Sequence, residues 1–150
     1  MDEIDRMILV HLTEDARQPL ATLGALVGLS PSAVNERIRR LGERGAIRRI
    51  MADTAPEALG LPVAAFIWVA LAAAADEGAF RVAMADHPAI TACHHVTGAW
   101  AYLLQIRAAD LAGVEDFLSS LKQDGWLAGS QTVLALSSVV EPPFRFRGPQ

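Results

Sequence analysis

Six arginines lie within thirteen residues in the N-terminal third of the chain. They occupy positions 37, 39, 40, 44, 48 and 49, and Glu43 is the only acid among them, so the local charge is +5. Guanidinium groups bind phosphate oxygens and the O6 and N7 atoms of guanine. Salt screens charges beyond about 8 Å, so this patch can attract a nucleic acid although the whole chain has a net charge of −4. The alternative is that the arginines only solvate an exposed helix face.

The residues around the patch predict three helices. The first runs from Asp2 to Asp15, and a short second helix runs from Leu20 to Gly28. Ser30 can cap a third helix that carries Pro31 in its first turn and ends near Gly45. Its apolar stripe consists of Val34, Ile38 and Leu41. The patch therefore begins on the third helix.

The second and third helices have the spacing of a helix-turn-helix. Gly24 lets the two helices approach, and Gly28 permits the tight turn between them. In this motif the second helix of the pair enters the DNA major groove by its N-terminal end. The pattern predicts that the helix beginning after Ser30 reads DNA.

The face opposite the apolar stripe supplies the candidates for DNA contact. Ser32, Asn35 and Glu36 suit base edges, since asparagine pairs with adenine and glutamate accepts from cytosine N4. The arginines at positions 37, 39 and 40 are assigned to guanine or phosphates, and those at positions 44, 48 and 49, further along the chain, to phosphates. The predicted DNA-binding residues are Arg17, Ser30, Ser32, Asn35, Glu36, Arg37, Arg39, Arg40, Arg44, Arg48 and Arg49.

The second half of the chain alternates between strand and helix patterns. A strand starts at Val63, a helix spans Asp76 to Asp86, and a hairpin joins Ile90–Val96 to Tyr102–Arg107. A second helix follows Asp110, with a last strand over about residues 130–140. The stripe of that helix is Leu111, Val114, Phe117, Leu118 and Leu121. The order β-α-β-β-α-β predicts a ferredoxin-like domain, with both helices on one face of a four-stranded antiparallel sheet.

These elements predict an α+β protein of two domains. A winged helix-turn-helix is expected over residues 1–52, with a short strand or wing from Ile47 to Met51. Turn residues favour a linker over residues 53–62. The ferredoxin-like domain is expected over residues 63–141, followed by a surface tail over residues 142–150.

The strand that starts at Val63 is apolar on both of its faces. Ile67 and Val69 alternate with Phe66 and Trp68. If one face packs on the helices, the other exposes large apolar side chains, and a second subunit is the simplest partner for them. The strand thus predicts an oligomer, unless the strand parity is misassigned or the strand contains a bulge.

Seven short motifs are spread over nearly the whole chain. They are Ile4 to Leu9, Asp15 to Arg17, Val27 to Ser32, Glu36 to Leu41, Gly45 to Ile47, His95 to Gly98 and Tyr102 to Leu104. In these motifs the chain resembles the Lrp/AsnC (leucine-responsive, feast/famine) transcriptional regulators. The resemblance implies sequence-specific binding to double-stranded DNA, homodimers that assemble into octamers, and an amino acid or related metabolite bound between subunits.

The resemblance also implies an effector site around the turn of the hairpin. Its candidate residues are Thr97, Gly98, Ala99, Trp100 and Tyr102. Family members commonly carry acidic residues where this chain has Ala99 and Ala101, and alanine cannot bind a ligand ammonium group. A more apolar ligand, or none, is therefore the alternative to an amino acid. Trp100 and Tyr102 suit hairpin packing as well as ligand contact.

The sequence does not favour an enzyme. It contains none of the motifs G-x-G-x-x-G, H-E-x-x-H and G-x-S-x-G, and no P-loop. On a strand His94 would point away from Cys93 and His95, which leaves only two potential metal ligands on one face. We expect no metal and no cofactor. Two alternatives remain: a siroheme decarboxylase-like enzyme, which shares this domain plan, and an interaction module that does not bind DNA.

Composition favours the cytoplasm, with association to the nucleoid. A single cysteine, Cys93, excludes an intrachain disulfide. The acidic N-terminus lacks the features of a signal peptide. The longest apolar run, Val63 to Ala75, is too short for a membrane-spanning helix, which needs about 20 residues.

Overall fold

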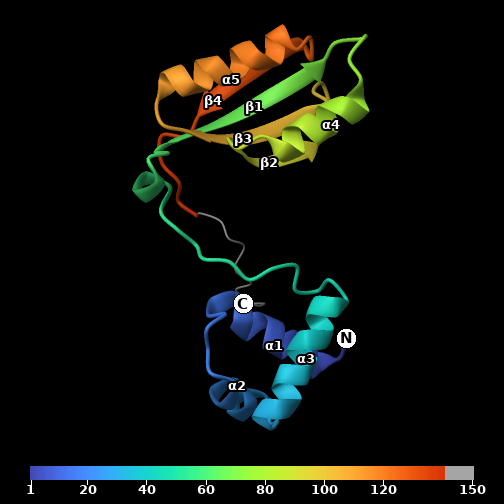
Figure 1. Cartoon of the computed structure of the whole chain (residues 1–150), viewed down its shortest axis with the longest axis vertical. Coiled ribbons are helices and arrows are strands. Elements are labelled where there is room, and N and C mark those ends of the chain that lie inside the picture. Colours follow the sequence, from blue (N-terminus) through green and yellow to red (C-terminus); the bar gives the residue numbers. More distant parts are fainter. Residues whose placement is uncertain (141–150) are drawn as a thin grey trace. The chain divides into compact units, whose positions relative to one another are not determined.

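The computed structural model describes residues 1–140, so the predicted surface tail over 142–150 lies outside the described residues. The described chain divides into two compact units, Met1–Asp53 and Thr54–Val139 (Figure 1). Each unit has its own cluster of buried apolar side chains.

The N-terminal unit consists of α1 (Glu3–Glu14), α2 (Leu20–Val27) and α3 (Pro31–Glu43). Asp2 caps α1: its Oδ1 accepts from the backbone N–H of Asp5 at 2.8 Å, and Asp5 Oδ2 accepts from the N–H of Asp2 at 3.2 Å. The core of the unit is Ile8, Leu23, Val27, Val34 and Leu41. The three predicted helices are confirmed.

The turn between α2 and α3 depends on two glycines. Gly28 adopts a left-handed conformation with a φ of 71° at the end of α2. A Cβ atom on Gly24 would lie only 2.5 Å from the backbone oxygen of Leu29, so a side chain there would push the helices apart. The predicted helix-turn-helix is confirmed in this geometry.

The predicted wing is wrong as a strand. After Gly45, which has a φ of 73°, the backbone N–H groups of Ala46 and Ile47 both bond to Leu41 O and close the end of α3. Ile47 then packs against the helical core, and residues 48–51 have no regular structure. A strand needs a neighbouring strand, and residues 1–53 offer none.

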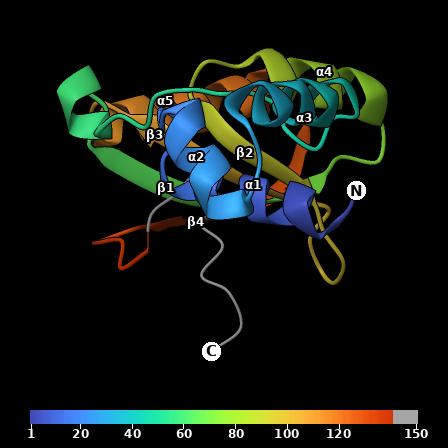
Figure 2. The same ribbon diagram turned by 90° about the horizontal axis from the view of Figure 1, so that it is seen from below.

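The C-terminal unit has the predicted order of strands and helices. It contains β1 (Val63–Leu71), α4 (Glu77–Asp86), β2 (Ile90–His95), β3 (Tyr102–Ala108), α5 (Leu111–Gln123) and β4 (Leu127–Leu134), preceded by the 3-10 helix η1 (Pro56–Leu59). The strands form one antiparallel sheet in the order β2-β3-β1-β4. Both helices lie on the same side of the sheet (Figure 2). The predicted ferredoxin-like arrangement is confirmed.

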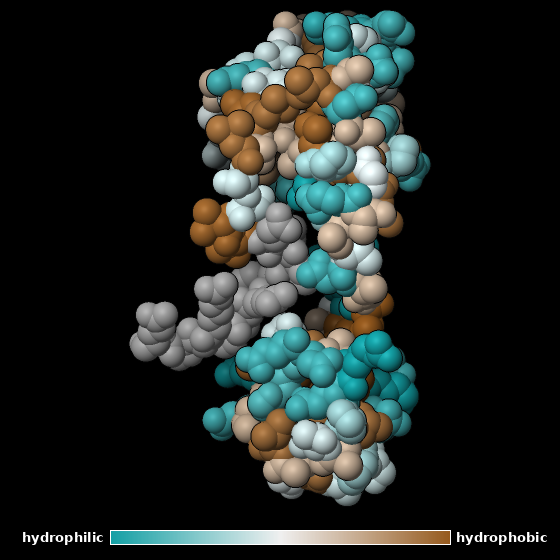
Figure 3. Space-filling view, turned by 90° about the vertical axis from the view of Figure 1, so that its left-hand side faces the viewer, coloured by the Kyte–Doolittle hydropathy of each residue, from teal (hydrophilic) through white to brown (hydrophobic). Residues whose placement is uncertain are grey.

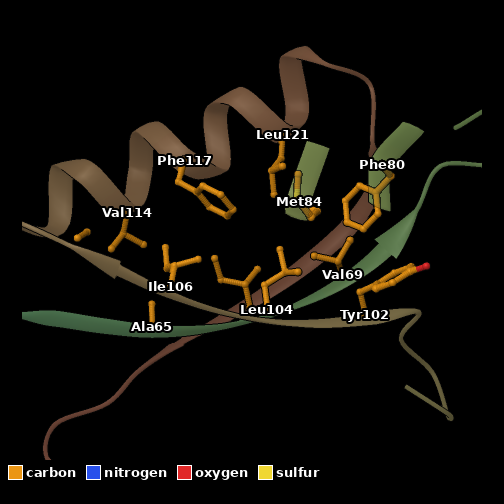
Figure 4. Close-up of a cluster of buried hydrophobic side chains, with 12 residues drawn as sticks. Ala65, Val69, Phe80, Met84, Tyr102, Leu104, Ile106, Val114, Phe117 and Leu121 are labelled. Carbon is orange, nitrogen blue, oxygen red and sulfur yellow. The ribbon is translucent and has the colours of Figure 1, made fainter. Parts of the chain in front are cut away.

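Side chains from α4, α5 and one face of the sheet form the core of this unit. Phe80 and Met84 come from α4, and Phe117 comes from α5 (Figure 4). They meet Ile67 of β1 and Leu104 of β3, and both of these side chains are fully buried. This layer fixes which face of each strand is turned away from the helices.

Two predicted details of this unit are wrong. The last strand begins at Leu127 and ends at Leu134, because Gly125 turns the chain directly after α5 and pairing with β1 runs only from Leu71 to Ala65. Leu111 is 61% exposed, because it opens α5 and lies off the buried stripe. The residues of α5 that the sheet buries are Val114, Phe117 and Leu121.

The outer face of the sheet carries large apolar side chains, as the two-sided pattern of β1 predicted, next to the polar residues Gln105 and Gln131. Trp68 pairs with Leu103 on one side and Gln131 on the other, while Phe66 pairs with Val133. Paired residues of antiparallel strands share a face, so Phe66, Trp68, Leu103 and Val133 form one cluster, here called the outer apolar face. A continuous apolar area is visible on the C-terminal unit in Figure 3.

Candidate functional site

The N-terminal end of α3 presents polar side chains to solvent. Ser30 Oγ accepts from the backbone N–H of Ala33 at 3.3 Å and lies 3.0 Å from Ser32 Oγ. Ser32 and Asn35 are exposed, whereas Val34 is fully buried against α1 and α2. The buried stripe thus turns the predicted base-reading residues outward.

Arg37 is held by the start of α1. Its Nη1 donates to Asp2 Oδ2 and to Asp5 Oδ1, both at 2.7 Å, and its side chain is only 28% exposed. The Arg37 guanidinium lowers the pKa of the Asp5 carboxyl; for Asp2 the backbone N–H of Asp5 is the larger cause of the lowered pKa. Asp2 and Asp5 thus engage one nitrogen of Arg37 and restrain the side chain that the sequence assigned to guanine or phosphate.

Glu36 engages two further arginines on the solvent face of α3. Arg39 donates from Nε to Glu36 Oε2 at 2.9 Å and from Nη2 to Oε1 at 2.7 Å, while Arg40 Nε donates to Oε1 at 2.8 Å. Arg39 Nη1 also pairs with Glu43. These hydrogen bonds lower the pKa of Glu36 to about 2 and raise that of Arg39. Exposed ion pairs of this kind add little to stability.

Four predicted arginines keep their charge available. Within residues 1–140 no carboxylate forms an ion pair with Arg17, Arg44, Arg48 or Arg49, and all four are exposed. Arg17 is held only through its backbone N–H, which donates to Asp15 Oδ1 at 2.8 Å. These side chains are free to approach an anion.

The structure lowers the charge of the arginine patch. The charge of +5 was counted over residues 37–49. That range begins one residue after Glu36 and leaves out Asp2 and Asp5, which lie far away in the chain. In the fold three of the six arginines contact four carboxylates, those of Asp2, Asp5, Glu36 and Glu43, so the six arginines and these four acids together carry +2.

A second candidate site is a hollow of about 480 Å³ beside the β2–β3 turn. Gly98, Ala99 and Trp100 line it, together with Glu77 and His95, whereas the predicted residues Thr97 and Tyr102 do not. The remaining lining residues are Ala70, Leu71, Val96 and Ala101. Gly98 has a φ of 107°, which favours glycine and lets the turn fold back beside β1. Three of the five predicted effector residues thus meet at one surface.

Tyr102 connects this hollow to the core. Its ring is 2% exposed and packs against Phe80, with centroids 4.9 Å apart. Its hydroxyl donates to Glu77 Oε1 at 2.6 Å and accepts from Arg81 Nε at 2.6 Å. The Tyr102 hydroxyl lowers the pKa of Glu77, and burial raises the pKa of Tyr102 itself. The sequence left two roles open for Tyr102, hairpin packing and ligand contact. Its burial against Phe80 favours packing.

Glu77 and Arg81 were missed at the sequence level. They are one helical turn apart in α4, and Arg81 Nη2 donates to Glu77 Oε1 at 3.1 Å. An i,i+4 charged pair is common on solvated helices, so it gives no sign of a site. The link to the hollow exists only in three dimensions: Tyr102 bonds to both side chains, and Arg81 Nη2 lies 3.4 Å from Nδ1 of His95.

The residues Cys93, His94 and His95 lie as strand alternation predicted. His94 pairs with Leu103 on the outer face, and His95 stacks on Tyr102 at 5.0 Å between centroids. In the part of the chain that the structure describes, no group of three or more histidine, cysteine or acidic residues is placed to hold a metal. Nor does any described helix have the length and apolar character needed to cross a membrane.

Comparison with known proteins identifies a class of regulator. The sequence model of the AsnC-type helix-turn-helix domain matches residues 1–42, and that of the Lrp/AsnC ligand binding domain matches residues 64–143. The chain belongs to the Lrp/AsnC family of transcriptional regulators.

Individual relatives agree with this membership. The chain is 36% identical to the HTH-type transcriptional regulator AldR of Mycolicibacterium smegmatis, over 89% of this chain and 80% of that protein. It is 35% identical to the HTH-type transcriptional regulator LrpC of Bacillus subtilis, over 79% and 82%. A transcriptional regulator of Neisseria meningitidis, solved with L-Met, matches with a TM-score of 0.87 and 29% identity over 94% of this chain and 93% of that one.

The chain is thus a DNA-binding regulator of transcription and not an enzyme. The relatives are named as transcriptional regulators, and nothing in them supports the siroheme decarboxylase alternative. The reading as an interaction module without DNA binding is also set aside, because the match to a DNA-binding domain covers the arginine-bearing helix.

Proposed function

We propose that the chain reads operator DNA with the solvent face of α3, as one arm of a homo-oligomer that a small molecule controls. The observation that carries this proposal is the exposed N-terminal end of α3, where Ser32 and Asn35 lie outward, together with the four arginines that have no carboxylate partner among the described residues, Arg17, Arg44, Arg48 and Arg49. Asparagine there can pair with an adenine edge. Arg17, Arg44, Arg48 and Arg49 would hold phosphates, which adds affinity without sequence preference.

The outer apolar face supports assembly through a second copy of the chain. Phe66, Trp68 and Leu103 are large and only partly buried in the single chain, and a matching face of another subunit would cover them. A two-fold axis there would present two α3 helices to half-sites one DNA turn, about 34 Å, apart. We further propose that such dimers assemble into octamers, as the family resemblance implies.

The hollow beside Trp100 is the proposed effector site. The related Neisseria regulator was solved with L-Met, which supports an amino acid or related metabolite as the ligand class. Ala99 and Ala101 make the turn apolar, while Glu77 and His95 supply the polar side chains of the lining. We propose that Gly98, Ala99 and Trp100 contact the ligand and that Tyr102 acts through Glu77.

The proposed organisation keeps residues 53–62 as the linker between a DNA-binding unit and an effector-binding unit. The irregular segment and η1 between α3 and β1 support it. A regulator of this kind acts on chromosomal DNA, so we propose that it is located in the cytoplasm, in association with the nucleoid.

Gel-shift titration of two alanine variants tests the DNA-reading proposal. Asn35→Ala should reduce affinity mainly for the preferred sequence, by roughly 5- to 100-fold, because it removes a base contact. Arg48→Ala should weaken binding to all sequences alike and reduce the salt slope by about 1, because it removes a phosphate contact. If wild-type affinity showed neither sequence preference nor steep salt dependence, the proposal would fail.

Calorimetry with a panel of L-amino acids tests the effector proposal separately. L-Met or another apolar amino acid should bind the wild type and bind Trp100→Ala at least about tenfold more weakly, since a large contact surface is lost. The matched control is Trp126→Phe, because Trp126 is not one of the residues that line the hollow. Equal binding to the wild type and Trp100→Ala would refute the site.

A further inference from the structure

The arginines of the patch differ in how many of their donors are already engaged. Arg39 uses Nε and Nη2 on Glu36 and Nη1 on Glu43, so each of its three nitrogens has a carboxylate partner. Arg40 uses only Nε, on Glu36. Arg44, Arg48 and Arg49 have no ion-pair partner within residues 1–140. Apart from Arg37, which Asp2 and Asp5 hold, the restrained arginines share one partner, Glu36.

We propose that Glu36 sets the sequence specificity of α3 by restraining Arg39 and Arg40 from the DNA backbone, an inference that rests on the proposed reading of DNA by this helix. A phosphate offers a guanidinium the same forked geometry as a carboxylate, so the two anions compete for Arg39. Phosphates occur along every DNA sequence. If Arg39 and Arg40 both move from Glu36 to phosphates, this carboxylate is left unpaired beside a polyanion, which disfavours binding to arbitrary DNA.

The preferred sequence avoids that penalty. Where a base presents an amino group in the major groove, Glu36 can accept a hydrogen bond from it, as from cytosine N4. Arg39 and Arg40 are then released to the guanine or phosphate beside it, and the carboxylate keeps a partner. Glu36 therefore costs more binding free energy on the wrong sequence than on the right one, while Arg44, Arg48 and Arg49 attract both.

The restraint holds across the pH range in which DNA binding is measured. The hydrogen bonds from Arg39 and Arg40 keep the pKa of Glu36 at about 2, so its charge is present at any pH near neutrality. The exposure of the three side chains, between 40% and 58%, leaves them accessible to a duplex.

The test uses the full-length protein with Glu36→Gln, and with Glu43→Gln as the matched control. Glu43 lies on the same helix and contacts Arg39 but not Arg40. Two duplexes of equal length and composition serve as probes: one selected by the wild type from a randomised pool, and its scramble. Gel-shift titrations are run at a series of KCl concentrations.

Glu36→Gln should bind the scrambled duplex about 5- to 50-fold more tightly than the wild type does. Its salt slope on that duplex should steepen by about 1 to 2, as expected when one or two more arginines reach phosphates. The ratio of selected to scrambled affinity should fall by about tenfold or more. Glu43→Gln should change this ratio by no more than about threefold, because Glu36 still holds both arginines.

Unchanged affinity of Glu36→Gln for the scrambled duplex would overturn the proposal, and so would an equal loss on both duplexes. Far-UV circular dichroism and assembly size must match the wild type. Glu36→Asp is the second variant: it keeps the charge on a shorter side chain, and its affinity ratio should lie between those of the wild type and Glu36→Gln. An affinity ratio for Glu36→Asp below that of Glu36→Gln would contradict a charge-based restraint.

Discussion

Arg37 and Arg39 are two residues apart on α3, yet their side chains meet different carboxylates. Successive residues of a helix are rotated by about 100°, so these two point to nearly opposite sides. Arg37 meets Asp2 and Asp5 at the start of α1, whereas Arg39 meets Glu36 and Glu43 on its own helix. One arginine therefore joins two helices, and the other faces solvent.

The bridge made by Arg37 should give the protein a pH-dependent stability. The pKa values of Asp2 and Asp5 are lowered in the fold. Their contribution is therefore complete above the ordinary carboxyl pKa of about 4 and is lost as the pH falls below it. Arg37→Gln should melt several degrees below the wild type at pH 6, with the difference shrinking toward pH 3. Thermal unfolding by circular dichroism at a series of pH values measures this.

Arg44→Gln is the control for that experiment, because Arg44 has no ion-pair partner in the described chain. Its melting temperature should stay close to that of the wild type at every pH. If Arg37→Gln and Arg44→Gln followed the same curve, the bridge would not stabilise the α1–α3 contact.

At the scale of elements, the turn between α2 and α3 is the most demanding feature of the N-terminal unit. Gly24→Ala would place a Cβ atom 2.5 Å from a backbone carbonyl, which cannot rotate away. The variant should lose about 1 to 3 kcal/mol of stability, and DNA affinity should fall with it. Chemical unfolding and gel shifts measure the two effects.

Gly42→Ala is the matched control within the same unit. Gly42 lies inside α3, and a Cβ atom there would meet nothing within 4 Å. Alanine is the better helix former, so this variant should gain about 0.5 to 1 kcal/mol. A loss of stability equal to that of Gly24→Ala would show that close helix approach is not the cause.

Local signals made most helices predictable from the sequence. Ser30, Asp76 and Asp110 each accept from a backbone N–H three residues further on, as caps do. The start of the last strand had no such signal, because it depends on pairing with β1. The prediction of a wing was wrong for a related reason. The alternation after Ile47 suggests a strand, but a strand needs a neighbouring strand, which the local sequence does not supply.

The candidate sites were predictable only in part. The outward residues of α3 followed from its apolar stripe, and their roles in DNA reading stay predictions. The bridge between Arg37 and Asp5 joins residues 32 positions apart, so no local pattern contains it. The hollow likewise depends on β1, α4 and the β2–β3 turn coming together, and therefore Glu77 was not found.

At the scale of the whole molecule, the outer apolar face connects assembly to DNA binding. Trp68→Glu should place a charge in the proposed subunit contact and reduce the oligomer to monomers, because an unpaired charge is costly to bury. Losing the second DNA-binding arm should weaken operator affinity by about 10²- to 10⁴-fold. Sedimentation analysis and gel shifts measure both effects.

Val82→Glu is the control for surface charge on the same unit. Val82 is 64% exposed on α4, on the side of the sheet opposite Trp68. Its assembly size and operator affinity should match those of the wild type. If Trp68→Glu remained fully assembled with a native circular dichroism spectrum, the outer apolar face would not be the subunit contact.

The three tryptophans of the chain give it built-in optical probes. Trp68 lies on the outer apolar face, Trp100 lines the hollow, and Trp126 packs against Phe80 at the edge of the core, with ring centroids 5.8 Å apart. Indole emission shifts with the polarity of its surroundings. With two of the three replaced by phenylalanine, emission from the remaining one would report subunit association, ligand entry or unfolding of the C-terminal unit without any label.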